Sequence, residues 1–284
     1  MSRVRDGTAT ARFQTRGRLR DPRRQRLTQS DPAASVLAHA RHVITTILVA
    51  SGLVLLAGCT GSDRKTAPQQ AKQVSILFVH GGGWAGGSSA DLEPLAIKYR
   101  GLGYNAISIE YRDANNNILH QIDNVQAQVS KYRAKGPVVL YGVSAGGTLA
   151  AALAAGGKVD GAVVVGAPTD LPAWSSNPYR GFLARKVLQA LGMTPAEVRD
   201  AWPTTRLTGR PAPQLLQYGD SDRLVPLQQR TSYARAAQEL QPDMKVETLR
   251  GVAHSAALVY TPSYAEHALD WIRQRWPAPD RRGS

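Results

Sequence analysis

A glycine-rich turn joins a short apolar run to a segment of small residues. The sequence Gly-Val-Ser-Ala-Gly-Gly at 142–147 directly follows the apolar run 138–141 and opens the alanine-rich segment 145–155. At such a strand–turn–helix junction the backbone of the central serine is strained and its hydroxyl group is exposed. Glycines flank the serine because a Cβ atom there would collide with the crowded junction. The turn therefore predicts a parallel α/β sheet that carries Ser144 as a nucleophile.

Short apolar strands alternate with helices along residues 74–276. This alternation predicts a mostly parallel sheet with helices on both faces. We expect strands at 74–79, 104–110, 138–141, 159–165, 215–218 and 246–249, and helices at 90–101, 118–134, 145–155, 227–240 and 263–275, with Ser89 as the N-cap of the first helix.

One proline-rich segment, residues 168–213, interrupts the alternation. Its periodicity is irregular, and it predicts an insertion with one helix near 180–191, placed like a lid before the fifth strand. Its aromatic residues either line a substrate pocket or pack the insertion onto the core, and the sequence leaves both readings open. They are Trp174, Tyr179, Phe182 and Trp202.

A second glycine run, His-Gly-Gly-Gly-Trp at 80–84, ends the first of these strands. Consecutive glycines leave the backbone N–H groups free to point at a developing negative charge, and no side chain obstructs the approach. A flexible glycine loop is the alternative, but the preceding strand and the serine turn some 60 residues later favour an oxyanion hole.

Together the two glycine motifs resemble the α/β-hydrolase superfamily, in particular the hormone-sensitive-lipase-like and related small carboxylesterases. Tyr111-Arg112, after the second strand, also resembles this group. The resemblance covers about residues 74–276. It implies an acid and then a histidine further along the chain.

The chain supplies both residues in that order. The sequence Gly-Asp-Ser-Asp-Arg-Leu-Val-Pro at 219–226 matches the family's acid loop, which selects Asp222 as the acid and Asp220 as the second choice. Asp170, after the fourth strand, is a less favoured acid position. Gly-Val-Ala-His at 251–254 matches the histidine loop.

The resemblance implies a role for each of these residues. His254 takes the proton of Ser144, and Asp222 holds the imidazole ring and stabilises its charged form. The expected oxyanion donors are the backbone N–H groups of Gly82, Gly83 and Ala145. His80 is expected to hydrogen-bond its own glycine loop.

The expected activity is hydrolysis of carboxylic esters with small or medium acyl groups. No cofactor is implied, and no metal site, because no histidines and carboxylates stand at metal-ligand spacing. Two alternatives stay open: an amidase or arylformamidase with the same triad, and a non-catalytic binding lipoprotein of this fold. The complete set of catalytic motifs argues against the second.

The chain departs from the lipase-like group before its first strand. Only about 20 residues separate Cys59 from His80, too few for the helical cap that those relatives usually carry there. Any lid must then come from 168–213. The compact feruloyl-esterase-like, acetyl-esterase-like and arylformamidase-like members are more similar to this chain.

The net charge of +14 does not predict nucleic-acid binding. Half of it lies in residues 1–58, which hold ten arginines and three aspartates. The remaining residues also carry +7, a mild excess that suits a surface near anionic lipid.

The apolar run 43–57 has 15 residues and no charge. It is shorter than the ~20 residues that span a membrane and typical of a signal peptide. It ends in Leu-Ala-Gly-Cys at 56–59, which resembles the bacterial lipobox. The resemblance implies that Cys59, the only cysteine, receives a diacylglycerol thioether and becomes the mature N-terminus. A short core helix ending in cysteine is the alternative.

These motifs divide the chain into a leader with signal peptide (1–58), a polar tether (59–73), the hydrolase domain (74–276) and a tail (277–284). The Arg-rich leader is unusually long for a lipoprotein signal. We expect translation to begin at an alternative start codon at Val36 or Leu37, so that 1–35 is not translated. The predicted location is the extracytoplasmic side of a bacterial envelope membrane, held by the lipid on Cys59. The oligomeric state is left open.

Overall fold

The computed structural model describes residues 72–176, 181–240, 243–254 and 262–278. In these residues six strands form one sheet in the order β2-β1-β3-β4-β5-β6, and every neighbouring pair is parallel. The strands are β1 (Ser75–Val79), β2 (Asn105–Ile109), β3 (Val138–Val143), β4 (Gly161–Val165), β5 (Gln214–Gly219) and β6 (Met244–Leu249).

The four inner strands are buried along their whole length. Their near-continuous apolar sequences are typical of parallel strands that are covered on both faces. The register carries this burial across the sheet, since Leu77 of β1 lies beside Ile107 of β2 and Leu140 of β3. The edge strand β6 is only partly buried.

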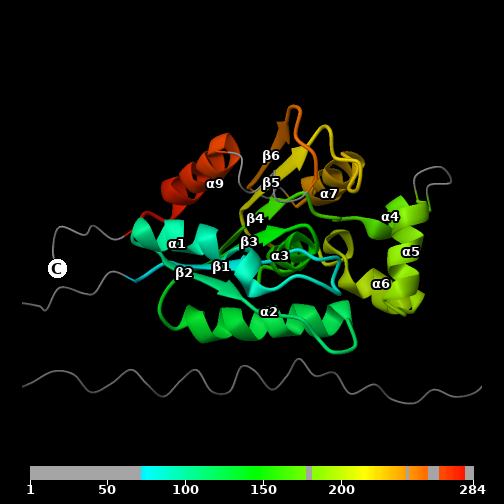
Figure 1. Ribbon diagram of the computed structural model, residues 1–284, viewed down its shortest axis with the longest axis horizontal. Coiled ribbons are helices and arrows are strands. Elements are labelled where there is room, and N and C mark those ends of the chain that lie inside the picture. The colour runs from blue at the N-terminus through cyan, green and yellow to red at the C-terminus, as the bar shows by residue number, and fades with distance from the viewer. Residues whose placement is uncertain (1–71, 177–180, 241–242, 255–261, 279–284) are drawn as a thin grey trace, which may run out of the picture. The chain divides into compact units, whose positions relative to one another are not determined.

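Helices cover the two faces of the sheet. Helices α1 (Glu93–Gly101) and α9 (Pro262–Arg275) lie on one face, and α2 (Ile118–Arg133) lies on the other (Figure 1). The helices α3 (Ala145–Ala155) and α7 (Gln228–Gln238) share a hydrophobic cluster with α2. Side chains of β1 alternate between the two clusters, as the period of a strand requires. The predicted α/β architecture is confirmed.

The segment between β4 and β5 contains more structure than the sequence predicts. The expected helix near 180–191 is α5 (Phe182–Ala190), but α4 (Leu171–Ser175), α6 (Pro195–Ala201) and the 3-10 turn η3 (Pro203–Thr205) accompany it. In Figure 1 these helices gather at the right of the sheet. The predicted helix near 180–191 is therefore confirmed, and the other short helices are structure that the sequence did not predict.

Capping explains the missed helices. Asp170 accepts a hydrogen bond from the backbone N–H of Ala173 at the start of α4. Thr194 and Glu197 form a reciprocal capping box at the start of α6. Such caps satisfy N–H groups that a short helix otherwise leaves without partners. Short helices of this kind carry too little apolar periodicity to be recognised by pattern alone.

The predicted helix at 90–101 also begins differently. A 3-10 turn, η2 (Ser89–Asp91), precedes α1, and Ser88 rather than Ser89 forms the capping box with Asp91. The expected N-cap was therefore wrong: Ser88 caps the 3-10 turn, and Leu92 is the N-cap residue of α1 itself. The backbone of Ser89 instead bonds the side chains of Ser108 in β2 and of Glu110 directly after β2.

The leader, Cys59 and most of the predicted tether lie outside the described residues, as does most of the tail. Within the described ranges, no helix has both the length and the apolar character needed to cross a membrane.

Candidate active site

Ser144 lies at the turn between β3 and α3 in a strained backbone conformation. Its φ of 53° and ψ of −118° fall outside the usual regions for a residue with a side chain. The turn is held in place because the N–H of Ser144 donates to the carbonyl of Val165 at 2.8 Å. A Cβ atom on Gly146 would lie 2.2 Å from the carbonyl oxygen of Val79. Glycine there lets α3 begin directly against the end of β1.

A chain of hydrogen bonds joins the three residues that the sequence selected. The Oγ atom of Ser144 lies 3.0 Å from Nε2 of His254, and Nδ1 of His254 lies 2.7 Å from Oδ2 of Asp222. Ser144 and His254 are 110 residues apart in sequence. The carboxyl ends of β3, β5 and β6 bring them together, because parallel strands end at the same edge of the sheet.

The carboxylate of Asp222 is fully buried and held by its own loop. Its Oδ1 accepts hydrogen bonds from the backbone N–H groups of Leu224 and Val225, both at 2.8 Å. These bonds leave Oδ2 facing His254. The acid loop therefore fixes the position of the carboxylate before any substrate binds.

The two alternative acids, Asp220 and Asp170, bind groups other than His254. Asp220 accepts hydrogen bonds from the N–H of Gly251 at 2.7 Å and from the hydroxyl of Ser221 at 3.1 Å. Asp170 caps α4. The geometry favours Asp222 over both.

The glycine loop after β1 lies against the serine. A Cβ atom on Gly81 would be 3.3 Å from Cβ of Ser144. Gly82, Gly83 and Trp84 follow with φ values of 113°, 60° and 65°. Among the described residues, no hydrogen bond engages the backbone N–H groups of Gly82, Gly83 and Ala145. The N–H of Ala145 also starts an 11-residue helix, where the helix dipole favours negative charge.

The sequence did not predict the residues that support this loop. Trp84 is buried, its carbonyl accepts from Nε2 of Gln121 at 2.7 Å, and its ring lies 5.5 Å from that of Trp202. Gln121 is a fully buried polar residue of α2 among the apolar residues Ile118, Ile122 and Val125. A glutamine beside the apolar face of a helix is the signal that could have singled it out.

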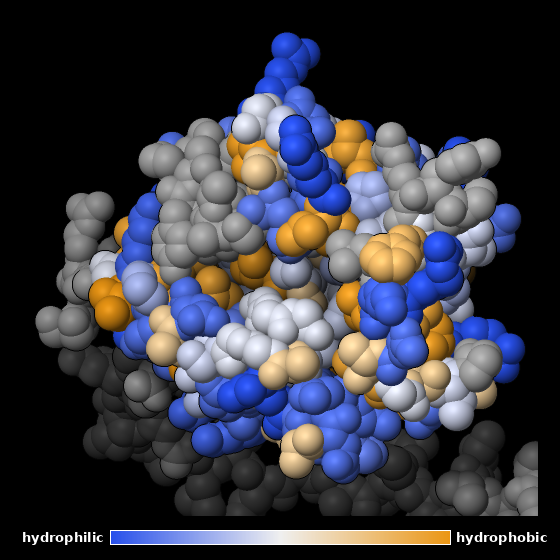
Figure 2. Space-filling model, turned by 45° about the vertical axis from the view of Figure 1, so that its right-hand side comes forward, coloured by the Kyte–Doolittle hydropathy of each residue, from blue (hydrophilic) through white to orange (hydrophobic). Residues whose placement is uncertain are grey.

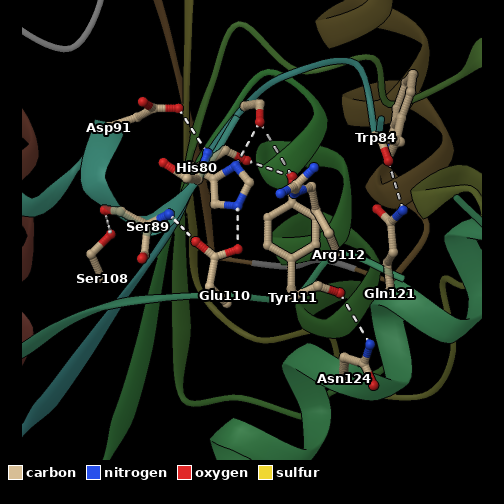
Figure 3. A network of polar contacts seen from close by, with 12 residues as sticks. His80, Trp84, Ser89, Asp91, Ser108, Glu110, Tyr111, Arg112, Gln121 and Asn124 are labelled. Carbon is tan, nitrogen blue, oxygen red and sulfur yellow. Dashed lines mark hydrogen bonds and ion pairs between the residues drawn. The ribbon is translucent and has the colours of Figure 1, made fainter. Parts of the chain in front are cut away.

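The hydroxyl of Tyr111 also holds the loop, because it donates to the carbonyl of His80 at 2.8 Å (Figure 3). Burial raises the pKa of Tyr111, so the phenol keeps its proton for this bond. The ring of His80 stacks on Tyr111 with the centroids 4.4 Å apart. As expected, Nδ1 of His80 bonds the glycine loop itself, at the carbonyl of Gly81.

A cavity of about 450 Å³ lies between the insertion and the acid loop. Figure 2 shows hydrophobic residues reaching the surface near the middle of the face that carries the insertion, with hydrophilic residues around them. The cavity is bounded by residues of α4, the acid loop and the start of α7: Trp174, Asp220, Asp222, Arg223, Leu224, Pro226, Leu227 and Gln228.

The aromatic residues of the insertion divide between the two roles that the sequence left open. Trp202 is fully buried against Trp84 and packs the insertion onto the core. Trp174 is mostly buried and lines the cavity. Phe182 is 64% exposed. Tyr179 lies outside the described residues.

No group of three or more histidine, cysteine, aspartate or glutamate side chains in the described ranges is arranged to hold a metal ion. His120 and His267 are each more than half exposed, and each lies 3.5 Å from a carboxylate.

The sequence of this chain matches the model of a known protein family. The family model BD-FAE matches residues 65–236, more than half of the chain, and the match includes both Ser144 and Asp222. This chain belongs to the BD-FAE family.

Among curated proteins, this BD-FAE member is similar to esterase LipC of Mycobacterium tuberculosis. The two are 28% identical over 239 residues, which cover 74% of this chain and 56% of LipC. The chain thus matches little more than half of the length of that relative.

Solved structures share the fold. The chain resembles Thermogutta terrifontis esterase 2 phosphonylated by sarin, with a TM-score of 0.62 and 19% identity over 74% of this chain and 87% of that one. The propionate-bound form of the same esterase gives a TM-score of 0.57 and 21% identity over 74% and 86% of the two chains. The butyrate-bound form gives the same values.

The close approach at Gly146 predicts a large difference between this glycine of α3 and Gly156, the C-cap of the same helix. Gly146→Ala should lower the free energy of unfolding by about 1–3 kcal/mol, because its Cβ would meet the backbone oxygens of Val79 and His80 at 2.2 and 2.3 Å. Gly156→Ala is the matched control, since the nearest atom to its Cβ lies 3.7 Å away. Urea unfolding of both variants measures the difference, and equal midpoints would contradict the proposed packing.

Proposed function

We propose that this protein hydrolyses carboxylic esters with Ser144 as the nucleophile. The observation that carries the proposal is the hydrogen-bonded chain from Ser144 through His254 to Asp222 at a strained strand–helix turn. Membership of the BD-FAE family and the similarity to LipC support an esterase activity.

The geometry supports a defined proton path. Because the carboxylate of Asp222 can only accept, Nδ1 of His254 holds the shared proton and the lone pair of Nε2 faces Ser144. His254 then removes the proton of Ser144 as Oγ attacks the ester carbonyl carbon. The same proton later passes to the alcohol oxygen as the C–O bond breaks, and water repeats the sequence on the acyl-enzyme.

The negative charge that develops on the carbonyl oxygen has partners in this site. The N–H groups of Gly82, Gly83 and Ala145 are the proposed donors, since each lies in the loop or helix start beside Ser144. Loss of one such donor costs about 2.7–4 kcal/mol of transition-state stabilisation in well-studied hydrolases. The loop is therefore an essential part of the proposed mechanism.

The proposed substrates carry small or medium acyl groups. A cavity of about 450 Å³ beside Asp222 is of a size that suits a small-molecule substrate. Thermogutta terrifontis esterase 2 has been crystallised with propionate and with butyrate. The acids bound to this relative favour short acyl chains.

We also propose that the mature protein is anchored to a bacterial membrane through a lipid on Cys59. The support is the sequence 56–59 after an uncharged run of 15 residues. A polar tether to residue 73 would let the hydrolase domain reach esters outside the cytoplasm.

The ester activity is tested with p-nitrophenyl acetate, butyrate and octanoate. We expect turnover with a preference for the shorter esters, and a loss of at least about 10³-fold in Ser144→Ala because the nucleophile is removed. Ser130→Ala, on an exposed position of α2, is the control. An aryl formamide in the same panel tests the amidase alternative, and activity that survives in Ser144→Ala would contradict the proposed nucleophile.

The acid is tested by the same chemical change at two positions of one loop. Asp222→Asn should lower kcat by about 10³–10⁴-fold, because the amide no longer fixes the productive tautomer of His254. Asp220→Asn should keep most of the activity, since an amide oxygen still accepts from the N–H of Gly251. Steady-state kinetics of both variants give the comparison, and the reverse order would make Asp220 the acid.

The anchor is tested by labelling with a radioactive fatty acid in a bacterial host that processes lipoproteins. The parent chain should be labelled and Cys59→Ser should not be, because a hydroxyl cannot form the thioether. Equal amounts of both chains are verified by immunoblot. An unlabelled parent chain, or a labelled Cys59→Ser variant, would remove the anchor from the proposal.

A further inference from the structure

The oxyanion loop, residues 80–89, does not hold its shape through regular structure. Three successive residues have positive φ, and one of them, Trp84, carries a side chain. Inside the loop, the carbonyl of Gly82 accepts from the N–H groups of Ala85 and Gly86 at 3.2 and 2.8 Å. This turn closes the middle of the loop and leaves its two ends to be fixed from outside.

The far end of the loop is fastened to the end of β2 through the backbone of Ser89. The N–H of Ser89 donates to Oε1 of Glu110, and its carbonyl accepts from Oγ of Ser108 at 2.6 Å (Figure 3). Both polar groups of this residue are thereby bound to one neighbouring segment.

The near end of the loop lies beside the same glutamate through the ring of His80. The ring is fully buried, and its Nδ1 must carry a proton because it bonds the carbonyl oxygen of Gly81 at 2.7 Å. The other nitrogen, Nε2, lies 3.6 Å from Oε2 of Glu110, too far for a hydrogen bond, and the contact is attractive only when both ring nitrogens carry a proton. Figure 3 shows the carboxylate of Glu110 between the ring of His80 and the backbone of Ser89.

Glu110 is a carboxylate at neutral pH. Partial burial raises its pKa, but the hydrogen bonds from Ser89 and the neighbouring His80 and Arg112 outweigh this effect and hold the pKa below its usual value. The side chain of Glu110 is 51% exposed, so its contribution is not that of a core residue.

We propose that Glu110 is a positioning residue for the oxyanion hole, because its carboxylate binds the backbone N–H of Ser89 at the far end of the glycine loop and lies beside the ring of His80 at the near end. It acts on the proposed N–H donors of Gly82 and Gly83 through His80 and Ser89 and does not itself contact the substrate. The inference rests on the proposed esterase function. A displacement of reacting groups by about 1 Å can lower a rate by about 10²-fold, so a loosened loop should be visible in kcat.

The test uses Glu110→Ala, Glu110→Gln and Ser108→Ala in the full chain, with Glu93→Ala as the control. Glu93 is also about half exposed and paired, in its case with Arg100. Each variant is assayed for kcat and KM on p-nitrophenyl butyrate and for inhibition by an alkyl boronic acid, which forms a tetrahedral adduct with the serine. Thermal midpoints are measured alongside.

We expect Glu110→Ala to lower kcat about tenfold or more while KM changes less than about twofold, because the hole acts mainly in the transition state. The inhibition constant of the boronic acid should rise by a similar factor. Glu110→Gln keeps an acceptor for Ser89 and should recover most of kcat. Ser108→Ala, which loosens only the far end, should fall between the parent and Glu110→Ala.

Three outcomes would overturn the inference. Glu110→Ala could match Glu93→Ala in kcat and in boronic acid inhibition. Glu110→Gln could lose as much kcat as Glu110→Ala. The thermal midpoint of Glu110→Ala could also be so low that unfolding accounts for its loss of kcat, while Ser108→Ala remains fully active. A parent chain that hydrolyses no ester would contradict the proposed function first and remove this inference with it, whereas an active parent with an unaffected Glu110→Ala contradicts the inference alone.

Discussion

The strained turn at Ser144 is the constraint on which the rest of the site depends. A serine with a φ of 53° is unfavourable in isolation and persists only where its surroundings fix it. Here the inner strands supply that support, since Val165 of β4 binds the N–H of Ser144 and Gly146 packs against the end of β1. The sheet thus keeps the backbone of Ser144 in its strained conformation, and this conformation holds the hydroxyl beside His254.

The glycine loop beside Ser144 depends on contacts from several separate elements. Tyr111 and Glu110 approach it from the end of β2, Gln121 from α2 and Trp202 from the insertion. A loop that offers free N–H groups to an oxyanion cannot use those groups to stabilise itself. Its stability comes from its other groups: the carbonyls of His80 and Trp84, the ring of Trp84 and the N–H of Ser89 are bound by neighbouring elements.

The sequence predicted the strands and most helices well because burial on both faces leaves a clear apolar pattern, as in β1 and β3. It did not predict α4 or α6, whose few residues depend on caps at Asp170 and Thr194. It selected Ser144, His254 and Asp222 through motifs, and the structure joins them by hydrogen bonds. It did not single out Gln121 or Glu110, because neither belongs to a short motif.

The sequence by itself determined the alternation of strands and helices, the two glycine motifs and the order of serine, acid and histidine. These depend on residues close together in the chain, where periodicity and turn chemistry act. Only the tertiary structure decided that Gln121 binds the carbonyl of Trp84, and that Trp202 packs against Trp84 while Trp174 lines the cavity. Such contacts join segments far apart in the chain, and the parallel register of the sheet sets the distances between them.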